Sequence, residues 1–171
     1  MNEIDILRAS THPHVVKLHD FYEDARFFFV VLEFLEGRDL FGHLESQVAS
    51  ENHIRTLVKQ LADGMAYVHN QLGVMHRDIK MENIIVLSPM PSSHPVAKII
   101  DFGLALVMMP HEKCYQAYGT LAYCSPEIIH NYPHTNCTDV WSFGIVVHVM
   151  LTLKIPFLAH HKRITSKNIV S

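Results

Sequence analysis

The periods of the sequence predict an α+β fold built around one hydrophobic core. Two runs rich in valine and phenylalanine, residues 15–18 and 26–32, have the composition of strands. Two later stretches have the composition of helices, one beginning after Ser50 and one covering residues 140–151. Of the 171 residues, 49% are hydrophobic and 18% are charged, which is enough apolar material for a globular core and too much for a disordered chain.

The N-terminal residues predict the end of a helix, followed by the two strands. Residues 2–10 place Ile4, Leu7 and also Ile6 on an inward face. The segment "THPH" stops this helix, because proline disfavours the helical conformation at the residue before it. A turn at residues 22–25 is expected to join the strands.

Two capping residues predict where the next helices begin. Asp39 can cap a short helix that runs through Gln47, and Ser50 can cap a longer one. Gly73 is suited to end the longer helix, because glycine is favoured just after a helix C-terminus. The apolar residues of this longer helix follow helical spacing, namely Ile54, Leu57, Val58, Leu61, Met65 and Val68.

The second half of the chain predicts two more strands and a buried helix. The apolar runs 84–87 and 96–100 are strand-like, and the proline- and serine-rich segment "SPMPSSHP" between them is expected to be exposed. Residues 103–127 are irregular and polar. The nearly all-apolar segment 140–151 predicts a helix buried on every side. Residues 158–171 have no strong period, which predicts a frayed tail.

Charge and composition argue against several functional classes. The formal net charge of −3 gives no electrostatic case for binding nucleic acid or an anionic membrane. The N-terminus has acids where a signal peptide needs a basic start, and the longest apolar stretch, 143–153, is too short to span a bilayer. The three cysteines lack a metal-ligand spacing and indicate a reducing compartment, hence the cytoplasm or nucleus. The 14 histidines are mostly scattered, which favours ordinary solvated or hydrogen-bonded side chains over a metal site.

The segment "HRDIKMENI" concentrates polar chemistry between two apolar runs. Asp78 and Asn83 are oxygen donors five residues apart, and Lys80 places a positive charge two residues after Asp78. A carboxylate beside a cation can accept a hydroxyl proton while the cation faces a phosphate. Asn83 can supply a neutral oxygen to a hard cation such as Mg²⁺. Asp101 ends an apolar strand just before Gly103, where a sharp turn is possible, and is also well placed to hold a metal.

Four motifs in this order resemble the signature of a eukaryotic-type protein kinase. They are "HRD" at 76–78, "DFG" at 101–103, "YGTLAYCSPE" at 118–127 and "DVWSFG" at 139–144. The lysine at position 80 and the threonine at position 120 resemble the Ser/Thr branch of the family, and "GRDLFGHL" resembles calcium/calmodulin-dependent-type kinases. Ser125 departs from the family, which usually has alanine there.

The resemblance implies ATP and Mg²⁺ as cofactors, a protein substrate with a Ser or Thr hydroxyl, and a role for each matching residue. Asp78 corresponds to the catalytic base and Lys80 to the cation that steadies the γ-phosphate. Asn83 and Asp101 correspond to the Mg²⁺ ligands. The residues expected around the adenine of ATP are Glu33, Leu35 and Ile85. The residues with implied structural or regulatory roles are Glu3, His76, Arg77, Phe102, Thr120, Glu127 and Asp139.

Several of these structural roles are specific. Glu3 matches the helical acid that pairs with a strand lysine in the family, and His76 and Phe102 match the apolar spine between the lobes. Asp139 matches the acid that anchors the backbone of the catalytic loop. Arg77 matches an arginine that an activation-loop phosphate commonly neutralises, although the usual phosphorylated position corresponds to Gln116, which cannot accept phosphate.

The resemblance runs from about Glu3 to Phe157 and implies a kinase-like bilobal fold truncated at both ends. Residues 1–35 would form a remnant N-lobe that lacks the family's first three strands, 36–157 a partial C-lobe that ends soon after the family's F-helix, and 158–171 a tail. The glycine-rich loop and the phosphate-binding lysine have no counterpart in these 171 residues. One N-lobe strand would therefore expose an edge that invites pairing or aggregation.

The implied function is a Ser/Thr protein kinase, with this chain expected to transfer phosphate poorly by itself. The alternative is a non-catalytic kinase-like module that binds protein partners. The chain keeps all four of its candidate catalytic and metal-binding residues, Asp78, Lys80, Asn83 and Asp101. A purely structural module has no physical need for that complete set, so the sequence favours kinase chemistry.

Overall fold

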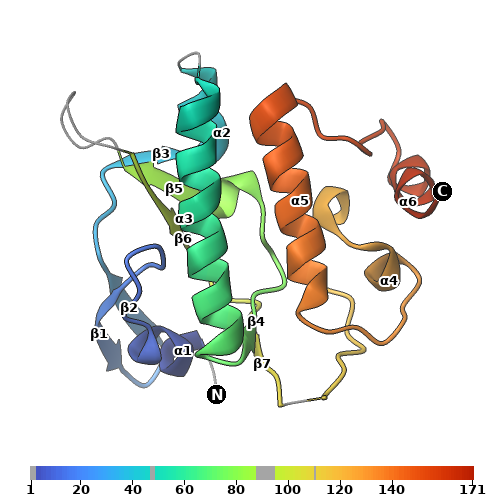
Figure 1. The fold of residues 1–171 in the computed structure, drawn as a ribbon. Helices are drawn as coiled ribbons and strands as arrows, with labels where there is room; N and C mark the ends of the chain where they lie inside the picture. Colours follow the sequence, from blue (N-terminus) through green and yellow to red (C-terminus); the bar gives the residue numbers. More distant parts are fainter. Residues whose placement is uncertain (1–2, 47–48, 88–94, 110) are drawn as a thin grey trace.

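Two long helices lie side by side at the centre of the protein, as the ribbon in Figure 1 shows. The computed structural model describes residues 3–46, 49–87, 95–109 and 111–171. The central helices are α3 (Glu51–Asn70) and α5 (Cys137–Thr152). Strands flank α3 on one side, and short helices flank α5 on the other. The mixture of helices and short antiparallel sheets confirms the predicted α+β class.

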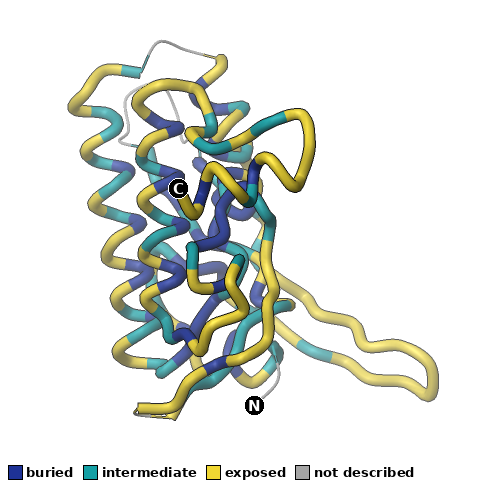
Figure 2. The backbone as a smooth tube through the Cα atoms, turned by 90° about the vertical axis from the view of Figure 1, so that its right-hand side faces the viewer, coloured by how far each residue is buried: buried dark blue, intermediate teal, exposed yellow. Residues whose placement is uncertain are grey.

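The N-terminal part consists of helix α1 (Glu3–Ala9) and a hairpin of strands β1 (Leu18–Glu23) and β2 (Phe28–Leu32). Ile6 and Leu7 are the buried residues of α1, as expected, whereas Ile4 is only half-buried. The hairpin projects from the body of the molecule and is almost wholly exposed in Figure 2.

The predicted boundaries of the first strand and its turn are wrong. Val15 and Val16 are buried, but they lie against strand β6 (Val96–Ile99) rather than in the hairpin: Val16 N–H donates to Ile99 O at 2.9 Å. The turn falls at residues 24–27 instead of 22–25. There the Asp24 side chain accepts hydrogen bonds from the backbone N–H groups of Arg26 and Phe27, which is the turn chemistry that aspartate favours.

Both predicted helix caps are present. The Asp39 carboxylate accepts the N–H of Gly42 at 2.8 Å at the start of α2 (Leu40–Glu45), and the Ser50 hydroxyl accepts the N–H of His53 at 3.2 Å at the start of α3. Gln47, the predicted end of α2, lies outside the described residues. Gly73 follows α3 with a φ of +64°, in the conformation that glycine adopts without strain.

Two small antiparallel sheets hold the segments around the catalytic motifs. Strands β3 (Gly37–Asp39), β5 (Ile84–Leu87) and β6 (Val96–Ile99) form one sheet, in which β5 is central. Strands β4 (Val74–Met75) and β7 (Leu106–Val107) form the other. Both predicted strands of the second half are present. The loop "SPMPSSHP" lies outside the described residues except for Pro95.

The region predicted to be irregular contains β7 and two short helical segments, η2 (Leu121–Tyr123) and α4 (Pro126–Ile129). Residues 158–171, predicted to be a frayed tail, instead contain helix α6 (Lys162–Val170). This helix packs on α4 and η2 and buries Thr165 and Ile169. With two buried positions, the sequence of α6 has too weak a hydrophobic period to predict a helix.

Helix α5 is not buried on every side, contrary to the prediction. Its buried face includes Ile145, Val146 and Val149, which join the core with α3. Val140 and Leu151 are 57% and 60% exposed, because no described element covers that side of the helix. Within the described ranges, no helix combines the length and the apolar character needed to cross a bilayer.

Candidate active site

The loop that carries "HRD" runs from β4 to β5, and a buried carboxylate holds its backbone. Asp139, in the first turn of α5, is 1% exposed. One of its oxygens accepts the N–H of His76 at 2.7 Å, and the other accepts the N–H of Arg77 at 2.9 Å. Arg77 has a φ of +69°, a conformation that costs free energy for a residue with a side chain. The two hydrogen bonds that Asp139 accepts stabilise this strained turn.

A third hydrogen bond to Asp139 comes from a residue that the sequence did not single out. His69, in the last turn of α3, lies with Nε2 2.8 Å from the Asp139 carboxylate, and the two side chains are 9% and 2% exposed. His69 therefore links α3, α5 and the catalytic loop. Its contact partner is 70 residues away in sequence, so nothing in local spacing separates it from the other scattered histidines.

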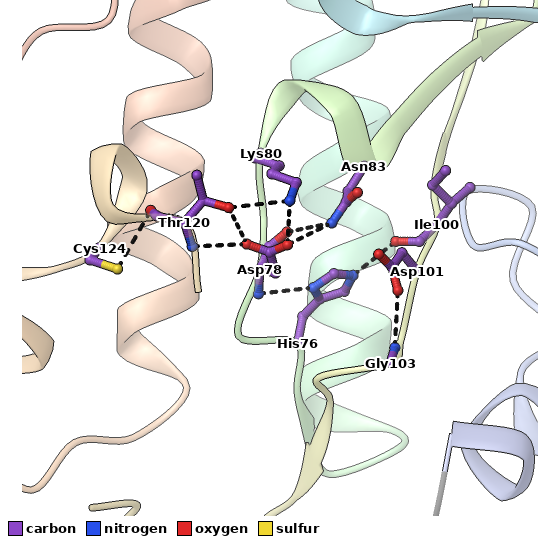
Figure 3. A network of polar contacts seen from close by, with 9 residues as sticks. All are labelled: His76, Asp78, Lys80, Asn83, Ile100, Asp101, Gly103, Thr120 and Cys124. Carbon is purple, nitrogen blue, oxygen red and sulfur yellow. Dashed lines mark hydrogen bonds and ion pairs between the residues drawn. The ribbon is translucent and has the colours of Figure 1, made fainter. Parts of the chain in front are cut away.

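Asp78 is the centre of the polar network in Figure 3. Lys80 Nζ donates to one carboxylate oxygen at 2.6 Å, and Asn83 Nδ2 donates to the same oxygen at 3.1 Å. The other oxygen accepts both the backbone N–H and the hydroxyl of Thr120, at 3.0 and 2.8 Å. The structure thus brings together four predicted residues from the catalytic loop and the segment before η2.

The environment of Asp78 keeps its side chain ionised. Burial on its own raises the pKa of Asp78, but hydrogen bonds from Lys80 and Thr120 and the charge of Lys80 outweigh burial and hold the pKa below its ordinary value. A carboxylate with a low pKa is a weak base. Its main contribution would be to orient a hydroxyl and to accept the proton once the hydroxyl oxygen has begun to react.

Asn83 and Asp101 offer oxygens of the kind that a divalent cation prefers. The side-chain amide nitrogen of Asn83 donates to the backbone carbonyl oxygen and to the carboxylate of Asp78. These two bonds leave the side-chain amide oxygen of Asn83 available. The backbone N–H of Ile100 donates to the backbone carbonyl oxygen of Asn83 at 2.9 Å. This bond holds the strand before Asp101 against the catalytic loop. Asp101 is exposed and has a φ of +64°, and one of its oxygens accepts the N–H of Gly103 at 3.1 Å.

The side-chain oxygens of Asn83 and Asp101 fit a cation that is also held by phosphate oxygens and water. Asp101 supplies a charged oxygen and Asn83 a neutral one, which is the incomplete protein ligand set typical of Mg²⁺ bound with nucleotide. No group of three or more His, Cys, Asp or Glu side chains able to hold a metal occurs among the described residues.

His76 and Phe102 form a buried contact beneath the catalytic loop. The ring centroids lie 4.9 Å apart, and both residues are 1% exposed. His76 Nδ1 lies 3.3 Å from the Asp78 N–H and Nε2 3.1 Å from the Ile100 carbonyl oxygen, so the tautomer that satisfies both carries its proton on Nε2. Burial lowers the pKa of His76 despite the nearby Asp139, which favours this neutral ring.

Glu3 lies beside the "DFG" turn. Its carboxylate oxygen is 3.8 Å from the point where a Cβ on Gly103 would lie. Burial raises the pKa of Glu3, and the negative charge of Asp101 raises it further. Glu3 forms no ion pair with any residue that the structure describes. The site therefore contains two neighbouring acids whose repulsion a cation would relieve.

The three residues expected around adenine come from two elements. Glu33 and Leu35 lie in the connection between β2 and β3, and Ile85 lies half-buried in β5. The Glu33 side chain accepts from Lys98 Nζ at 2.6 Å and from the Lys17 N–H at 2.8 Å. These contacts fix the start of the connection between the two parts of the fold.

The guanidinium group of Arg77 is held by neutral groups. Its Nε donates to the carbonyl oxygen of Leu104, and its Nη1 donates to the Gln116 side chain at 3.3 Å. The guanidinium lies 4.6 Å from the ring centroid of Tyr118. Glu127, at the end of "SPE", is exposed and makes no ion pair within the described part of the chain.

Comparisons with known proteins agree with this geometry. The family model of the protein kinase domain matches residues 1–171. The chain is 36% identical to rat ribosomal protein S6 kinase alpha-1 over 165 residues, which cover 95% of the chain and 22% of that protein. It is 35% identical to mouse sperm motility kinase 2B, covering 92% of the chain and 32% of the relative. It is 34% identical to mouse death-associated protein kinase 2, covering 99% of the chain and 45% of the relative.

The chain therefore spans between about a fifth and somewhat under half of the length of these relatives. The family match covers every motif on which the resemblance rests, and the fold places Asp78 and the Asp101 strand on adjoining segments of one site. From motif order, fold and comparison together, the chain belongs to the protein kinase family.

Proposed function

We propose that this chain carries the catalytic centre of a Ser/Thr protein kinase, which transfers the γ-phosphate of ATP to a serine or threonine hydroxyl of a protein. The observation that carries the proposal is the Asp78 carboxylate, ionised and hydrogen-bonded to Lys80, Asn83 and Thr120. The Lys80 and Thr120 pair at this carboxylate is the feature that favours Ser or Thr over Tyr as the acceptor.

The proposed reaction assigns one task to each residue. The hydroxyl oxygen of the substrate forms a bond to the γ-phosphorus while the bond from that phosphorus to the bridging oxygen of ADP breaks. Asp78 orients the hydroxyl and accepts its proton. Lys80, held by Asp78 and Thr120, presents its ammonium group to the transferred phosphate. Asn83 and Asp101 would hold Mg²⁺, which when bound neutralises phosphate charge.

Glu33, Leu35 and Ile85 are proposed to contact adenine, since the connection after β2 and the strand β5 are the elements at which the family binds it. Glu3 is proposed to pair with a lysine, which would relieve its repulsion from Asp101. The protein is proposed to act in the cytoplasm or nucleus, because all three cysteines are free thiols.

The test is transfer of radiolabel from ATP to a Ser/Thr peptide. Two forms are assayed. One is the chain by itself, and the other is the chain joined to a glycine-rich loop and lysine-bearing strand from a kinase of known activity. The Asp78→Asn variant of each form serves as its blank. We expect Asp78-dependent transfer from the joined chain and little from the 171 residues alone, since phosphoryl transfer depends on positioned phosphate contacts. A joined chain that folds and binds ATP but transfers no label above the Asp78→Asn blank would support a non-catalytic binding module instead.

A further inference from the structure

A small cavity lies between the end of α1, the segment before β1 and strand β6, on the strand side of α3 (Figure 1). Its volume is about 220 Å³, and its walls are Ser10, Thr11, His12, Pro13, Lys17 and Lys98. Backbone hydrogen bonds join the two sides of the cavity, because the Ile99 N–H donates to His14 O and the Val16 N–H donates to Ile99 O, both at 2.9 Å. None of the six wall residues belongs to the candidate active site, so the cavity is a separate feature of the fold.

Two lysines give the cavity a positive charge. Lys17 forms no ion pair with any residue that the structure describes. The Lys98 ammonium group donates to Glu33 Oε1 at 2.6 Å, and the Lys98 side chain is 12% exposed. An ammonium group has three N–H donors, so this bond leaves two of them for another acceptor. Glu33 balances one of the two positive charges, and the other is left for an anion.

A second acid, Asp63 in α3, contacts one wall of the cavity. Its carboxylate lies 3.4 Å from His12 Nε2, and its side chain is 68% exposed to solvent. His12 Nδ1 accepts the N–H of His14 at 3.2 Å, so the tautomer that satisfies both contacts carries its proton on Nε2. Because solvent screens an exposed charge, Asp63 cancels little of the positive charge of the two lysines.

The hydroxyl of Ser10 is an unsatisfied polar group in the wall of the cavity. Ser10 is 5% exposed, and its Oγ has no hydrogen-bond partner among the described residues. The N–H of Ser10 donates to Leu7 O at 3.2 Å, which fixes the residue at the end of α1. Buried hydroxyl groups without a partner are uncommon in folded proteins, because burial without a hydrogen bond costs free energy. An acceptor atom bound in the cavity would remove that cost.

We propose that this cavity is a binding site for a phosphate group, carried either by inorganic phosphate or by a small phosphate monoester. A phosphate group carries about 1.5–2 negative charges near pH 7 and at least three acceptor oxygens, which is enough for Lys17, Lys98 and Ser10 together. A carboxylate has two oxygens and a single charge, so it matches these three donors less well. A volume of about 220 Å³ is far above the roughly 10–15 Å³ that one water molecule needs, and a phosphate group therefore fits.

The proposal is tested by titrating the ¹⁵N-labelled chain with inorganic phosphate, and separately with phosphoserine, against chloride at the same ionic strength. The readout is the NMR shift of the Ser10, Thr11 and Lys17 amides, because concentrated phosphate raises the Tm of proteins without a specific site. The variants are Lys17→Gln and Ser10→Ala. The matched control is Lys167→Gln, which removes an exposed lysine of α6, far from the cavity. Thermal unfolding in chloride checks that each variant is folded.

We expect saturable shifts of these amides in the unmodified chain and in Lys167→Gln, and an affinity about tenfold lower in Lys17→Gln and in Ser10→Ala, since each variant loses a hydrogen bond to a charged group. Ser10→Ala should not lower the Tm in chloride, because it removes a hydroxyl that has no partner.

The two probes distinguish the two sources of the phosphate group. Saturation by phosphoserine at the affinity of inorganic phosphate would support a monoester as the ligand, and saturation by inorganic phosphate alone would support the free ion. Shifts that grow without saturation with both probes, or affinities that are equal in all the variants, would overturn the proposal.

Discussion

Replacing Asp139 by asparagine tests how the catalytic loop is held. The carboxylate is 1% exposed and accepts two backbone N–H groups and His69. Asparagine keeps one carbonyl oxygen, so its amide nitrogen must face the N–H of His76 or of Arg77. Leaving one buried donor unsatisfied costs about 1–3 kcal/mol, and the lost charge-assisted bonds bring the total to about 3 kcal/mol.

A loss of about 3 kcal/mol should lower the Tm by roughly 6–12 °C in a chain of this size. The assay is thermal unfolding by circular dichroism, with amide exchange at His76 and Arg77 to locate the effect. Asp63→Asn is the matched control, because Asp63 is 68% exposed and only faces His12 at 3.4 Å. If Asp139→Asn shifted the Tm no more than Asp63→Asn does, the anchoring role argued for Asp139 would be wrong.

Two further substitutions test the strained and the charged parts of the site by thermal unfolding. Glu3→Gln should raise the Tm at pH 7 by a few degrees and leave the Tm unchanged near pH 3. The reason is that the pKa of Glu3 in the folded chain is raised above 4.5. Ionisation of Glu3 therefore favours the unfolded chain once the pH exceeds that value. An equal Tm gain at both pH values would exclude charge repulsion as the cause. Gly119→Ala should cost about 1–3 kcal/mol, because Gly119 has a φ of +112° and its Cβ would lie 2.6 Å from the Arg77 carbonyl oxygen. Gly144→Ala, in open space on α5, should instead stabilise by about 0.5–1 kcal/mol, and equal effects of the two alanines would contradict the close approach at Gly119.

The sequence could indicate which candidate site residues lie together, because most of them are close in the chain. Asp78, Lys80 and Asn83 lie within one loop, and motif order placed Thr120 and Asp101 near it. The structure joins Thr120 to Asp78 and holds the Asp101 strand against Asn83. His69 was missed because its role exists only through a contact with α5.

The errors in predicting the fold have a common physical origin, because each depends on contacts with other elements that local sequence patterns do not show. Val15 and Val16 have strand-like side chains, but their backbone pairs with β6, so local propensity gave the right conformation and the wrong partner. Helix α6 buries too few residues to show a period. The apolar composition of α5 predicted burial on all sides, although composition does not reveal which neighbours are present to cover Val140.

The most direct test of the proposed chemistry separates nucleotide binding from transfer. The joined chain with the glycine-rich loop and lysine-bearing strand is measured for Mg²⁺–ATP affinity and for single-turnover transfer, as Asp78→Asn and as Asp101→Asn. Asp78 is proposed to touch the hydroxyl and not the nucleotide, so Asp78→Asn should lower transfer by about 10²–10⁴-fold at nearly unchanged affinity. Asp101→Asn should weaken affinity only when Mg²⁺ is present. Equal losses of ATP affinity in the two variants, or transfer that survives Asp78→Asn, would contradict the assignment of these residues to one phosphoryl-transfer centre.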